Sequence, residues 1–446
     1  MALGGGTFLA QNKVLPGAYI NFVSAAAATA ALSDRGYVTM PLELDWGMDQ
    51  EVFTVTNEDF HENAQRIFGY AWEHEKMKGL RDLFMNASTL YAYRLNGGGK
   101  RAANDYATAK CSGIRGNDLA VKIQENIDEP DMWDVITYLG TDMVDYQTVS
   151  NPEGLSANDY VDFKDSITLE AVACAKLSGG ENGTVTGTSY QDYADRIESY
   201  VFNTMGIVTT DDTVKKMFAS LNRRLRDEMG IKFQLVVYNY AQADCMGVIS
   251  VKNKCLDGAV RDGEGRMQYP DEAAAVYWTT GAEGGCKVNA SCQNRVYDGE
   301  YCIDTAYTQV ELMGAIRGGE FVFHSVNQEV CVLEDVNTMV TTTENCGDVF
   351  KDNQTIRVID QLANDDAVLF KTKYLGRIPN DDAGRSALWS DLVKIRKDLQ
   401  TLRAIEDFVE DDVSVELGDT KKAVVVKSTI TVVNAMSKMY MTVTVG

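Results

Sequence analysis

Polar and apolar side chains alternate strictly over the last residues of the chain. The apolar positions are Met439, Met441, Val443 and Val445, and the polar positions between them are Lys438, Tyr440, Thr442 and Thr444. Alternation with a period of two, in residues that favour β-structure, is typical of a half-buried strand. Because chain termini fray unless another segment holds them, this predicted strand needs a partner.

Residues 209–253 follow a different period. Apolar residues recur at helical spacing at Val214, Met217, Phe218, Leu221, Leu225 and Met229. Asp211 or Asp212 is a suitable N-cap, and Gly230 stands where a helix C-terminus favours glycine. Residues 231–239 and 247–253 have the composition of buried strands. Strand, helix and strand in this order predict a mostly parallel sheet.

A long amphipathic helix is predicted from residue 385 to residue 408. Its apolar stripe consists of Leu388, Leu392, Ile395, Leu399, Leu402 and Ile405. Its other faces carry four basic residues, which are Lys394, Arg396, Lys397 and Arg403. This pattern fits either an ordinary solvated face or a surface that contacts an acidic partner.

Two glycine-rich stretches enclose a segment of β character. Residues 96–100 (NGGGK) and 177–183 (LSGGENG) flank short strands separated by turn residues, the pattern of a small sandwich or barrel. A phosphate-binding loop needs G-x-x-x-x-G-K-[ST], but Arg94 occupies the first glycine position and Arg101 the hydroxyl position. The two stretches are therefore predicted to be hinges around an inserted β-domain.

Length and charge narrow the function classes. A chain of 446 residues is expected to form two to four domains. The chain has 42 lysines and arginines against 65 aspartates and glutamates, so its formal net charge is 42 − 65 = −23. A surface with this negative charge repels nucleic acid and anionic lipid. The apolar run at residues 22–32 is too short for a membrane span, and residues 1–13 do not resemble a signal peptide. We expect folding in the cytosol.

Candidate chemistry is sparse. The nine cysteines contain no C-x-x-C pair, and the closest two are Cys286 and Cys292. The few histidines offer no metal-ligand spacing, so reduced and mostly buried thiols are expected. There is no G-x-S-x-G motif, and His324 and Ser325 would point to opposite faces of a strand. No metal, cofactor or catalytic residue is predicted.

Motifs along nearly the whole chain resemble one family. They are MALGGGTF, NKVLPGAYINFVS, LSDRGYVTMPLELDWG, LYAYRLNGG, ATAKCSGIRGND, LSGGENG, ADCMGVISVKN, EDVNTMVT, RVIDQLANDD, TLRAIEDF and VVNAMSKMYMTVTV. In this order they resemble the tail sheath proteins of contractile phage tails and phage-tail-like bacteriocins, and most closely those of Gram-positive prophage particles.

The resemblance implies an α/β plus β fold, with a subtilisin-like α/β core that lacks catalytic residues. The expected parts are an N-terminal arm (1–22), a discontinuous core (23–97 and 183–345), an inserted β-sandwich or barrel domain (98–182), an α+β C-terminal domain (346–436) and a C-terminal strand arm (437–446). In this family, terminal arms add strands to a sheet of neighbouring subunits. The residues expected in these strands are Phe8, Val14, Met439, Tyr440, Met441, Thr442, Val443 and Val445.

The implied function is mechanical. Subunits would form homo-hexameric rings stacked helically around a tail tube protein, with baseplate and tail-terminator proteins at the ends, and would shorten to drive the tube through a cell envelope. The resemblance places a C-terminal helix at the inner wall, so Lys394, Arg396, Lys397 and Arg403 are expected to contact the tube. Neither nucleic acid binding nor direct membrane insertion is implied. The location would be a virion or phage-tail-like particle assembled in the bacterial cytoplasm.

Two alternatives remain open at this point. One is an α/β hydrolase-like enzyme with a β-rich accessory domain, which serine-directed covalent labelling would reveal. The other is a tube or baseplate component, although tube proteins are usually much shorter and all-β.

Overall fold

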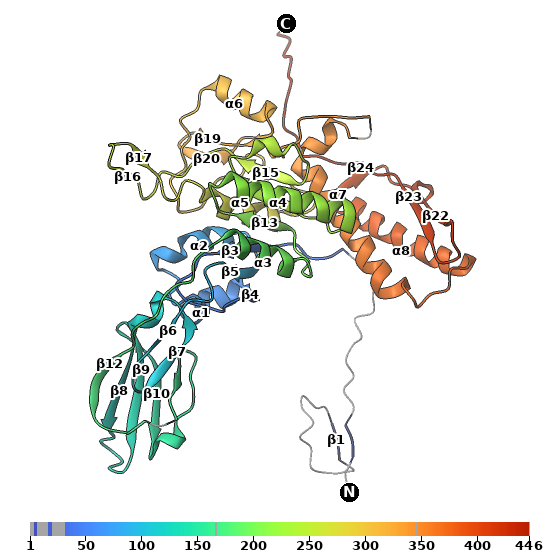
Figure 1. Cartoon of the computed structure of the whole chain (residues 1–446). Coiled ribbons are helices and arrows are strands. Elements are labelled where there is room, and N and C mark those ends of the chain that lie inside the picture. The colour runs from blue at the N-terminus through green and yellow to red at the C-terminus, as the bar shows by residue number, and fades with distance from the viewer. Residues whose placement is uncertain (1–3, 7–16, 20–31, 166, 345, 446) are drawn as a thin grey trace. The chain divides into compact units, whose positions relative to one another are not determined.

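A computed structural model describes residues 4–6, 17–19, 32–165, 167–344 and 346–445 (Figure 1). The chain divides into two compact units. The larger comprises residues 34–363 with 432–446, and the smaller comprises residues 364–431 with 1–33.

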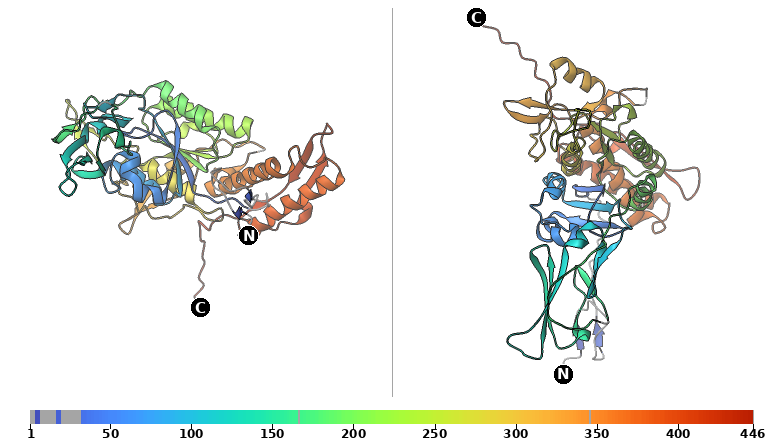
Figure 2. Two further views of the ribbon diagram at one scale, coloured as in Figure 1. Left: turned by 90° about the horizontal axis from the view of Figure 1, so that it is seen from below. Right: turned by 60° about the vertical axis from the view of Figure 1, so that its left-hand side comes forward.

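A seven-stranded sheet forms the centre of the larger unit (Figure 1 and Figure 2). Its strand order is β18 (Glu320–Phe321), β15 (Val248–Val251), β14 (Gln234–Tyr238), β13 (Thr204–Ile207), β3 (Tyr37–Leu42), β5 (Thr89–Arg94) and β4 (Val52–Thr56). Every neighbouring pair is parallel except β4 with β5. The mostly parallel sheet predicted from the sequence is confirmed.

Helices cover both faces of this sheet. On one face α1 (Asn57–Phe68), α2 (Lys78–Phe84) and α5 (Ala275–Gly285) pack over a core that includes Val236. On the other, α3 (Gly187–Ile197) and α4 (Asp212–Arg224) pack over a core that includes Leu235 and Val237. Successive residues of β14 thus serve opposite cores, and for this reason the strand has a continuous apolar run rather than an alternating pattern.

The helix expected after residue 211 begins and ends as predicted. Asp211 caps α4 by accepting a hydrogen bond from the Thr213 amide, and a π-helical turn, η4 (Leu225–Met229), follows. Gly230 then adopts a left-handed conformation with φ of 74°. A residue with a Cβ would be strained there, so glycine is the residue that ends this helix at low cost.

The inserted segment is a β-sandwich. One sheet has the order β10 (Asp142–Val149), β9 (Trp133–Leu139), β8 (Leu119–Glu125) and β12 (Val172–Lys176), and the other has β11 (Val161–Phe163), β7 (Ala107–Ser112) and β6 (Arg101–Ala103). Apolar residues from both sheets, such as Ala109, Val121 and Val135, form its core. The prediction of a small β-domain between two glycine-rich stretches agrees with this arrangement.

The glycine-rich stretches form a tight neck. Lys100 and Glu181 exchange two backbone hydrogen bonds (2.9 and 3.1 Å), and Ala103 and Ser178 exchange two more (2.9 and 3.0 Å). A Cβ at Gly99 would clash with the Glu181 carbonyl oxygen. Glycine is therefore required here for the close approach of two backbones, and the interpretation as hinges is replaced by that of a paired, closely packed entrance and exit.

The rest of the larger unit consists of short elements. They are η1 (Glu75–Met77), η2 (Ile114–Asp118), η3 (Pro152–Gly154), η5 (Ala241–Ala243), the β16–β17 hairpin (Val260–Arg261 and Met267–Gln268), α6 (Gln309–Arg317), the β19–β20 hairpin (Phe323–Val326 and Glu329–Val332) and η6 (Asp348–Lys351). His324 lies within β19, as expected for a strand residue. Among the described residues, no helix is both long and apolar enough to cross a membrane.

Helix α7 (Asn353–Leu369) crosses from one unit into the other and continues as a π-helical turn, η7 (Phe370–Tyr374). The smaller unit then contains α8 (Asp382–Thr401), β21 (Ile405–Glu406), η8 (Glu410–Asp412) and the antiparallel pair β22 (Val413–Leu417) and β23 (Val424–Ser428). Helix α8 ends earlier than predicted. Leu402 is exposed, and Ile405 is buried as part of a strand.

Candidate subunit interface

The C-terminal segment is anchored at its base and free beyond it. After β24 (Thr431–Val432), the Gln354 side chain donates to the Val433 carbonyl (3.1 Å) and accepts from the Ala435 amide (2.9 Å). Thr355 and Asn434 form a further side-chain hydrogen bond (3.1 Å). From Met436 onward, the described residues belong to no helix or strand of their own chain.

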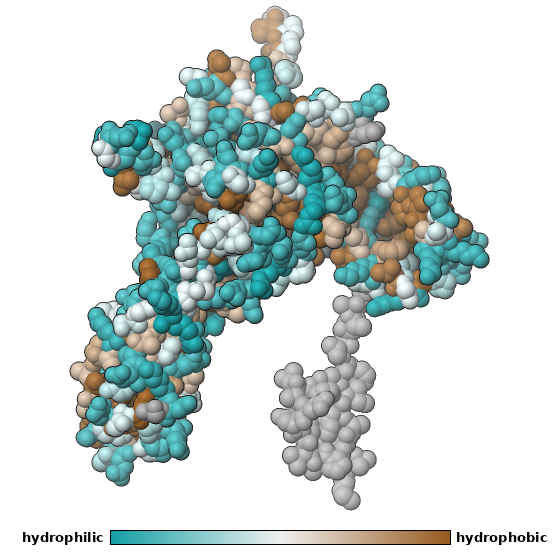
Figure 3. Space-filling view, viewed as in Figure 1, coloured by the Kyte–Doolittle hydropathy of each residue, from teal (hydrophilic) through white to brown (hydrophobic). Residues whose placement is uncertain are grey.

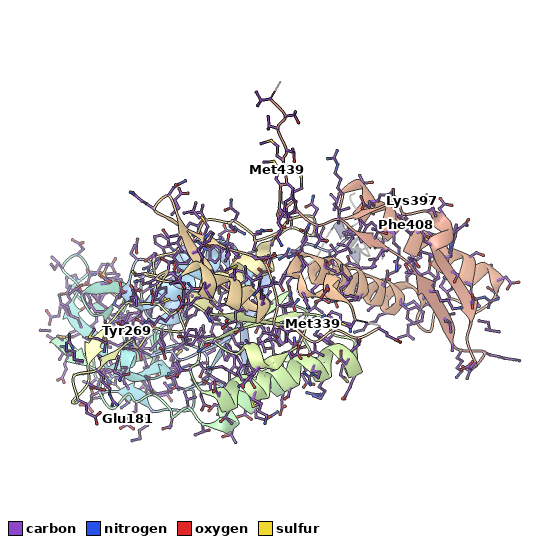
Figure 4. All side chains as sticks on the ribbon, turned by 90° about the horizontal axis from the view of Figure 1, so that it is seen from above. Glu181, Tyr269, Met339, Lys397, Phe408 and Met439 are labelled. Atoms are coloured by element: carbon purple, nitrogen blue, oxygen red, sulfur yellow. The ribbon has the colours of Figure 1, made fainter. Side chains whose placement is uncertain are left out.

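Apolar side chains on this segment face solvent. Met439 is 82% exposed and Tyr440 is 91% exposed, and the remaining large apolar residues, Met436, Met441, Val443 and Val445, are exposed as well. Figure 3 shows apolar residues on the projecting segment, and Figure 4 places Met439 along it. Soluble proteins rarely leave such a run unpaired, so its pattern points to an interaction site.

The smaller unit contains a sheet with open edges. Among the residues that the structure describes, strands β22 and β23 pair only with each other, and Leu417, Val425 and Val426 are exposed. The Trp389 indole of α8 donates to the Val413 carbonyl (2.9 Å) and so fixes β22 to the helix. A two-stranded sheet with exposed apolar residues can accept an additional strand, because no third strand of the described part of the chain pairs with its edges.

The N-terminal residues expected to join such a sheet, Phe8 and Val14, lie outside the described residues. The described N-terminal residues form two short strands, β1 (Gly4–Gly6) and β2 (Gly17–Tyr19), which pair in parallel.

The structure separates the four basic residues of the C-terminal helix. Arg396 is only 2% exposed, and its guanidinium makes a bidentate ion pair with Asp366 (2.7 Å to each carboxylate oxygen). It is therefore an interior residue of the smaller unit, and its assignment to a tube-contacting surface is wrong. The sequence held a signal for this position, because Arg396 lies four residues after Leu392 and so borders the apolar stripe.

The other three basic side chains are exposed. Lys397, labelled in Figure 4, pairs with Glu410. Lys394 and Arg403 have no ion-pair or hydrogen-bond partner for their side chains within the described ranges. Arg403 has an unusual backbone, with φ of 60°, just past the end of α8. This left-handed position normally favours glycine, so an arginine there carries a backbone cost of about 1–2 kcal/mol.

A buried charge cluster, defined here as Glu283, Asp335 and Arg357, lies in the larger unit. All three side chains are at most 1% exposed. The Arg357 guanidinium donates to Glu283 (2.5 Å) and contacts Asp335 (3.4 Å). Asp335 also accepts hydrogen bonds from the Cys292 amide (2.8 Å) and the Asn353 side chain (2.9 Å). The cluster thus fastens the start of α7 to α5.

Electrostatics explain the protonation of the cluster. Burial, and then the Asp335 carboxylate, raise the pKa of Glu283 well above its ordinary value. Burial acts to raise the pKa of Asp335, but the Arg357 guanidinium and the hydrogen bonds from Glu283, Cys292 and Asn353 together outweigh it, and the net pKa lies below the usual value. A neutral Glu283 with an ionised Asp335 and a positive Arg357 leaves the cluster without net charge.

This geometry argues against a metal centre. The potential ligand atoms of Glu283, Cys292 and Asp335 lie within 4.8 Å of one another, which is metal-like spacing. Arg357 already supplies the positive charge between the two carboxyl groups, and an ion would have to displace it.

Cys286 and Cys292 are buried, as the sequence predicted, and a hydrogen bond from Cys292 lowers the pKa of Cys286 to about 6.

Comparisons with known proteins now decide the family. Four family models match consecutive parts of the chain: the tail sheath protein Gp18 domain III N-terminal region (35–95), the phage tail sheath protein beta-sandwich domain (97–182), its central domain (183–338) and the phage tail sheath C-terminal domain (347–446). The phage-like element PBSX protein XkdK of Bacillus subtilis is 30% identical over 478 residues, with all of both chains covered. The chain belongs to the phage tail sheath family.

Solved structures agree with this assignment. The sheath tail protein of Desulfitobacterium hafniense is 35% identical, with a TM-score of 0.75 over 90% of this chain and 93% of the other. The anti-feeding prophage helical sheath in its contracted state shares the fold at 11% identity, with a TM-score of 0.55 over 97% of this chain and 99% of that one. Nothing in the comparisons supports the hydrolase alternative.

Proposed function

We propose that this tail sheath protein is the repeating subunit of a contractile sheath. It would form stacked hexameric rings around a tail tube and shorten to drive the tube through a cell envelope. Family membership along the whole chain supports the sheath role, and the structure of the contracted anti-feeding prophage sheath provides the architectural precedent. The observation that carries the proposal is the exposed, alternating C-terminal segment, anchored at its base by Gln354.

In this proposal, residues 437–446 add a strand to the β22–β23 sheet of another subunit. Met439, Met441, Val443 and Val445 would lie on the buried face of the extended sheet, with Tyr440, Thr442 and Thr444 opposite. Each ladder hydrogen bond contributes roughly 0.5–1.5 kcal/mol, and each fully buried apolar side chain about 1.5–3 kcal/mol. The N-terminal arm around Phe8 and Val14 would complete the same mesh from a further subunit.

A strand link suits a sheath that changes length. The link is a ladder of backbone hydrogen bonds at the end of a covalent tether, so two subunits can rotate relative to each other while the ladder stays intact. Energy for shortening would come from the difference between two packings of the same subunits, without nucleotide.

We also propose that Lys394, Lys397 and Arg403 contact the inner tube. Lys394 and Arg403 are exposed cations in an acidic protein, and Arg403 occupies a left-handed position where glycine would be less strained. Exposed ion pairs contribute only about 0–1 kcal/mol each, so attachment would depend on many subunits and weaken with salt. Contacts of this strength can be broken during contraction.

The remaining parts of the proposal concern architecture and context. The parallel sheet with helices on both faces is compatible with a subtilisin-like core, and we propose that this core has no catalytic role. The subunit would assemble in the cytoplasm of the producing bacterium and meet baseplate and tail-terminator proteins at the sheath ends. Serine-directed covalent labelling of the purified protein should give no adduct.

Deletion of residues 437–446 tests the central claim. The deletion leaves the Gln354 anchor and both compact cores intact, so the variant should remain folded and monomeric, with the melting temperature of the full-length monomer. It should form no sheath in size-exclusion chromatography and negative-stain microscopy. A truncated chain that still polymerises would refute the strand exchange, and one that unfolds would show that the segment pairs within its own chain.

A further inference from the structure

A cleft of about 620 Å³ opens in the larger unit at the carboxyl ends of the parallel strands. Its floor includes Glu43, Leu44 and Asp45 after β3, and Val208, Thr209 and Thr210 after β13. Strand β3 is flanked in the sheet by β5 on one side and by β13 on the other, and later strands of the chain extend the sheet beyond β13. The strand order therefore reverses between β3 and β13, which is where the cleft lies. Such a reversal point is where open α/β sheets bind ligands, and the volume lies within the range of about 300–1,000 Å³ typical of ligand pockets.

The cleft is acidic. Glu43, Asp45, Glu75 and Asp271 line it together with one ammonium group, that of Lys76, which gives a formal charge of −4 + 1 = −3. The Asp45 carboxylate already has partners within the chain, because it accepts hydrogen bonds from Tyr70 (2.7 Å), Asn182 (2.8 Å) and Lys76. Glu43 and Asp271 have no hydrogen-bond or ion-pair partner for their carboxylates among the residues that the structure describes. Two carboxylates thus remain available.

Aromatic rings form the walls. At the rim the ammonium of Lys76 lies 5.2 Å from the centre of the Tyr70 ring, and that of Lys78 lies 4.5 Å from the centre of the Tyr301 ring. The chain's own lysines therefore already use these rings as cation–π partners. Further inside, Tyr277 has no such cation over its ring within the described part of the chain.

Tyr277 is held rigidly. Its ring packs on Gly79, where an added Cβ would lie 2.6 Å from the ring. Burial, followed by the negative charges of Asp271 and Glu43, raises the pKa of Tyr277 to about 12, so the phenol stays neutral at physiological pH. Tyr190 also lines the cleft, and burial followed by the negative charge of Glu43 raises the pKa of its phenol. A fixed aromatic surface beside two available carboxylates is complementary to a cation with an apolar stem.

We propose that this cleft binds a guanidinium or ammonium group on an aliphatic stem, with Glu43 and Asp271 pairing the charge and Tyr277 stacking against the stem. Such a group is present on free polyamines and on the arginine or lysine side chains of another protein of the particle. The proposal is independent of the strand exchange, because the cleft lies within the larger unit and uses no residue of the C-terminal segment.

Binding is tested by calorimetric titration of the full-length protein with agmatine and with spermidine. The test variant is Glu43→Gln with Asp271→Asn, and the matched control is Glu62→Gln with Glu228→Gln, which removes the same charge from exposed positions elsewhere. We expect the amine affinity of the test variant to fall at least tenfold relative to both the wild type and the control. Tyr277→Leu, which removes the ring that stacks against the stem, should bind both amines more weakly, whereas Tyr277→Phe, which keeps the ring, should bind them nearly as well as the wild type.

The source of the cation is decided by a second measurement on the same proteins. If a neighbouring protein supplies it, agmatine should inhibit sheath polymerisation of the wild type, and the test variant should polymerise poorly. If a free amine is the ligand, polymerisation should be unaffected in both cases. Absence of amine binding to the wild type, or equal affinity in the test and control variants, would overturn the proposal.

Discussion

Replacing Arg357 by methionine should lower the free energy of unfolding of the larger unit by more than any surface substitution does. Methionine keeps much of the side-chain volume but removes the cation between Glu283 and Asp335, and all three side chains are at most 1% exposed. Breaking a buried ion pair by removing one partner costs about 3–5 kcal/mol, because the other charge remains buried without compensation. Solvent screening does not reduce this figure here, since water does not reach the cluster.

The assay is urea denaturation of the monomeric 437–446 deletion variant, followed by circular dichroism. Arg317→Met, an exposed arginine at the end of α6, serves as the control and should change the unfolding free energy by at most about 0.5 kcal/mol. Adding Glu283→Gln and Asp335→Asn to Arg357→Met should recover part of the loss, because the cluster then holds no carboxyl group without its cation. A loss below about 1 kcal/mol for Arg357→Met would contradict the assigned role of the cluster.

The pH dependence of this loss has a defined sign. Burial acts to raise the folded-state pKa of Asp335, but Arg357 and the hydrogen bonds that Asp335 accepts depress it on balance, so its stabilising contribution is present above the unfolded pKa and disappears as the pH falls through the folded pKa. Without Arg357, only the hydrogen bonds oppose burial, so the folded-state pKa of Asp335 should rise. The difference in unfolding free energy between wild type and Arg357→Met should therefore be larger at pH 7 than at pH 4, and equal differences at the two pH values would refute the reasoning.

Three further outcomes are expected. Arg403→Gly should raise the unfolding free energy by about 0.5–1 kcal/mol, because the strain relieved in the left-handed backbone exceeds the entropy that glycine adds to the unfolded chain. The same variant should co-sediment less with tubes, and a lower unfolding free energy would contradict the assigned strain. Arg396→Ala should lower thermal stability through loss of its pair with Asp366, and a melting temperature equal to wild type would contradict its interior role. Val443→Ser should raise the polymerisation threshold at least tenfold and Thr444→Ser less than threefold, as measured by light scattering; equal effects would refute the one-sided burial.

Local patterns predicted local structure well. The α4 helix was found with its Asp211 cap and Gly230 terminus because both signals lie next to the apolar repeat that they delimit. The buried strand β14 was found because a strand covered on both faces has a continuous apolar run. Such features depend on residues that are neighbours in sequence.

Features that depend on distant residues were not predicted. Glu283 and Arg357 are 74 positions apart, and nothing in either local sequence indicates that they meet. The end of α8 was placed too late because Leu402 and Ile405 continue the helical spacing, whereas the left-handed turn at Arg403 ends the helix without a glycine. The neck glycines were interpreted as flexible because composition cannot distinguish freedom from close packing.

The neck of the β-sandwich has a consequence for engineering and for evolution. The chain enters and leaves the sandwich through adjacent residues, held by the reciprocal hydrogen bonds of Lys100 with Glu181 and of Ala103 with Ser178. A foreign domain whose own ends are close together can therefore be grafted at this point. The graft must also replace the contacts that the sandwich makes with core residues, because Trp46 packs within the sandwich and Arg94 donates to the Ser112 carbonyl. With those two positions redesigned, the inserted module can be exchanged for an enzyme or reporter while the seven-stranded sheet keeps its sequence.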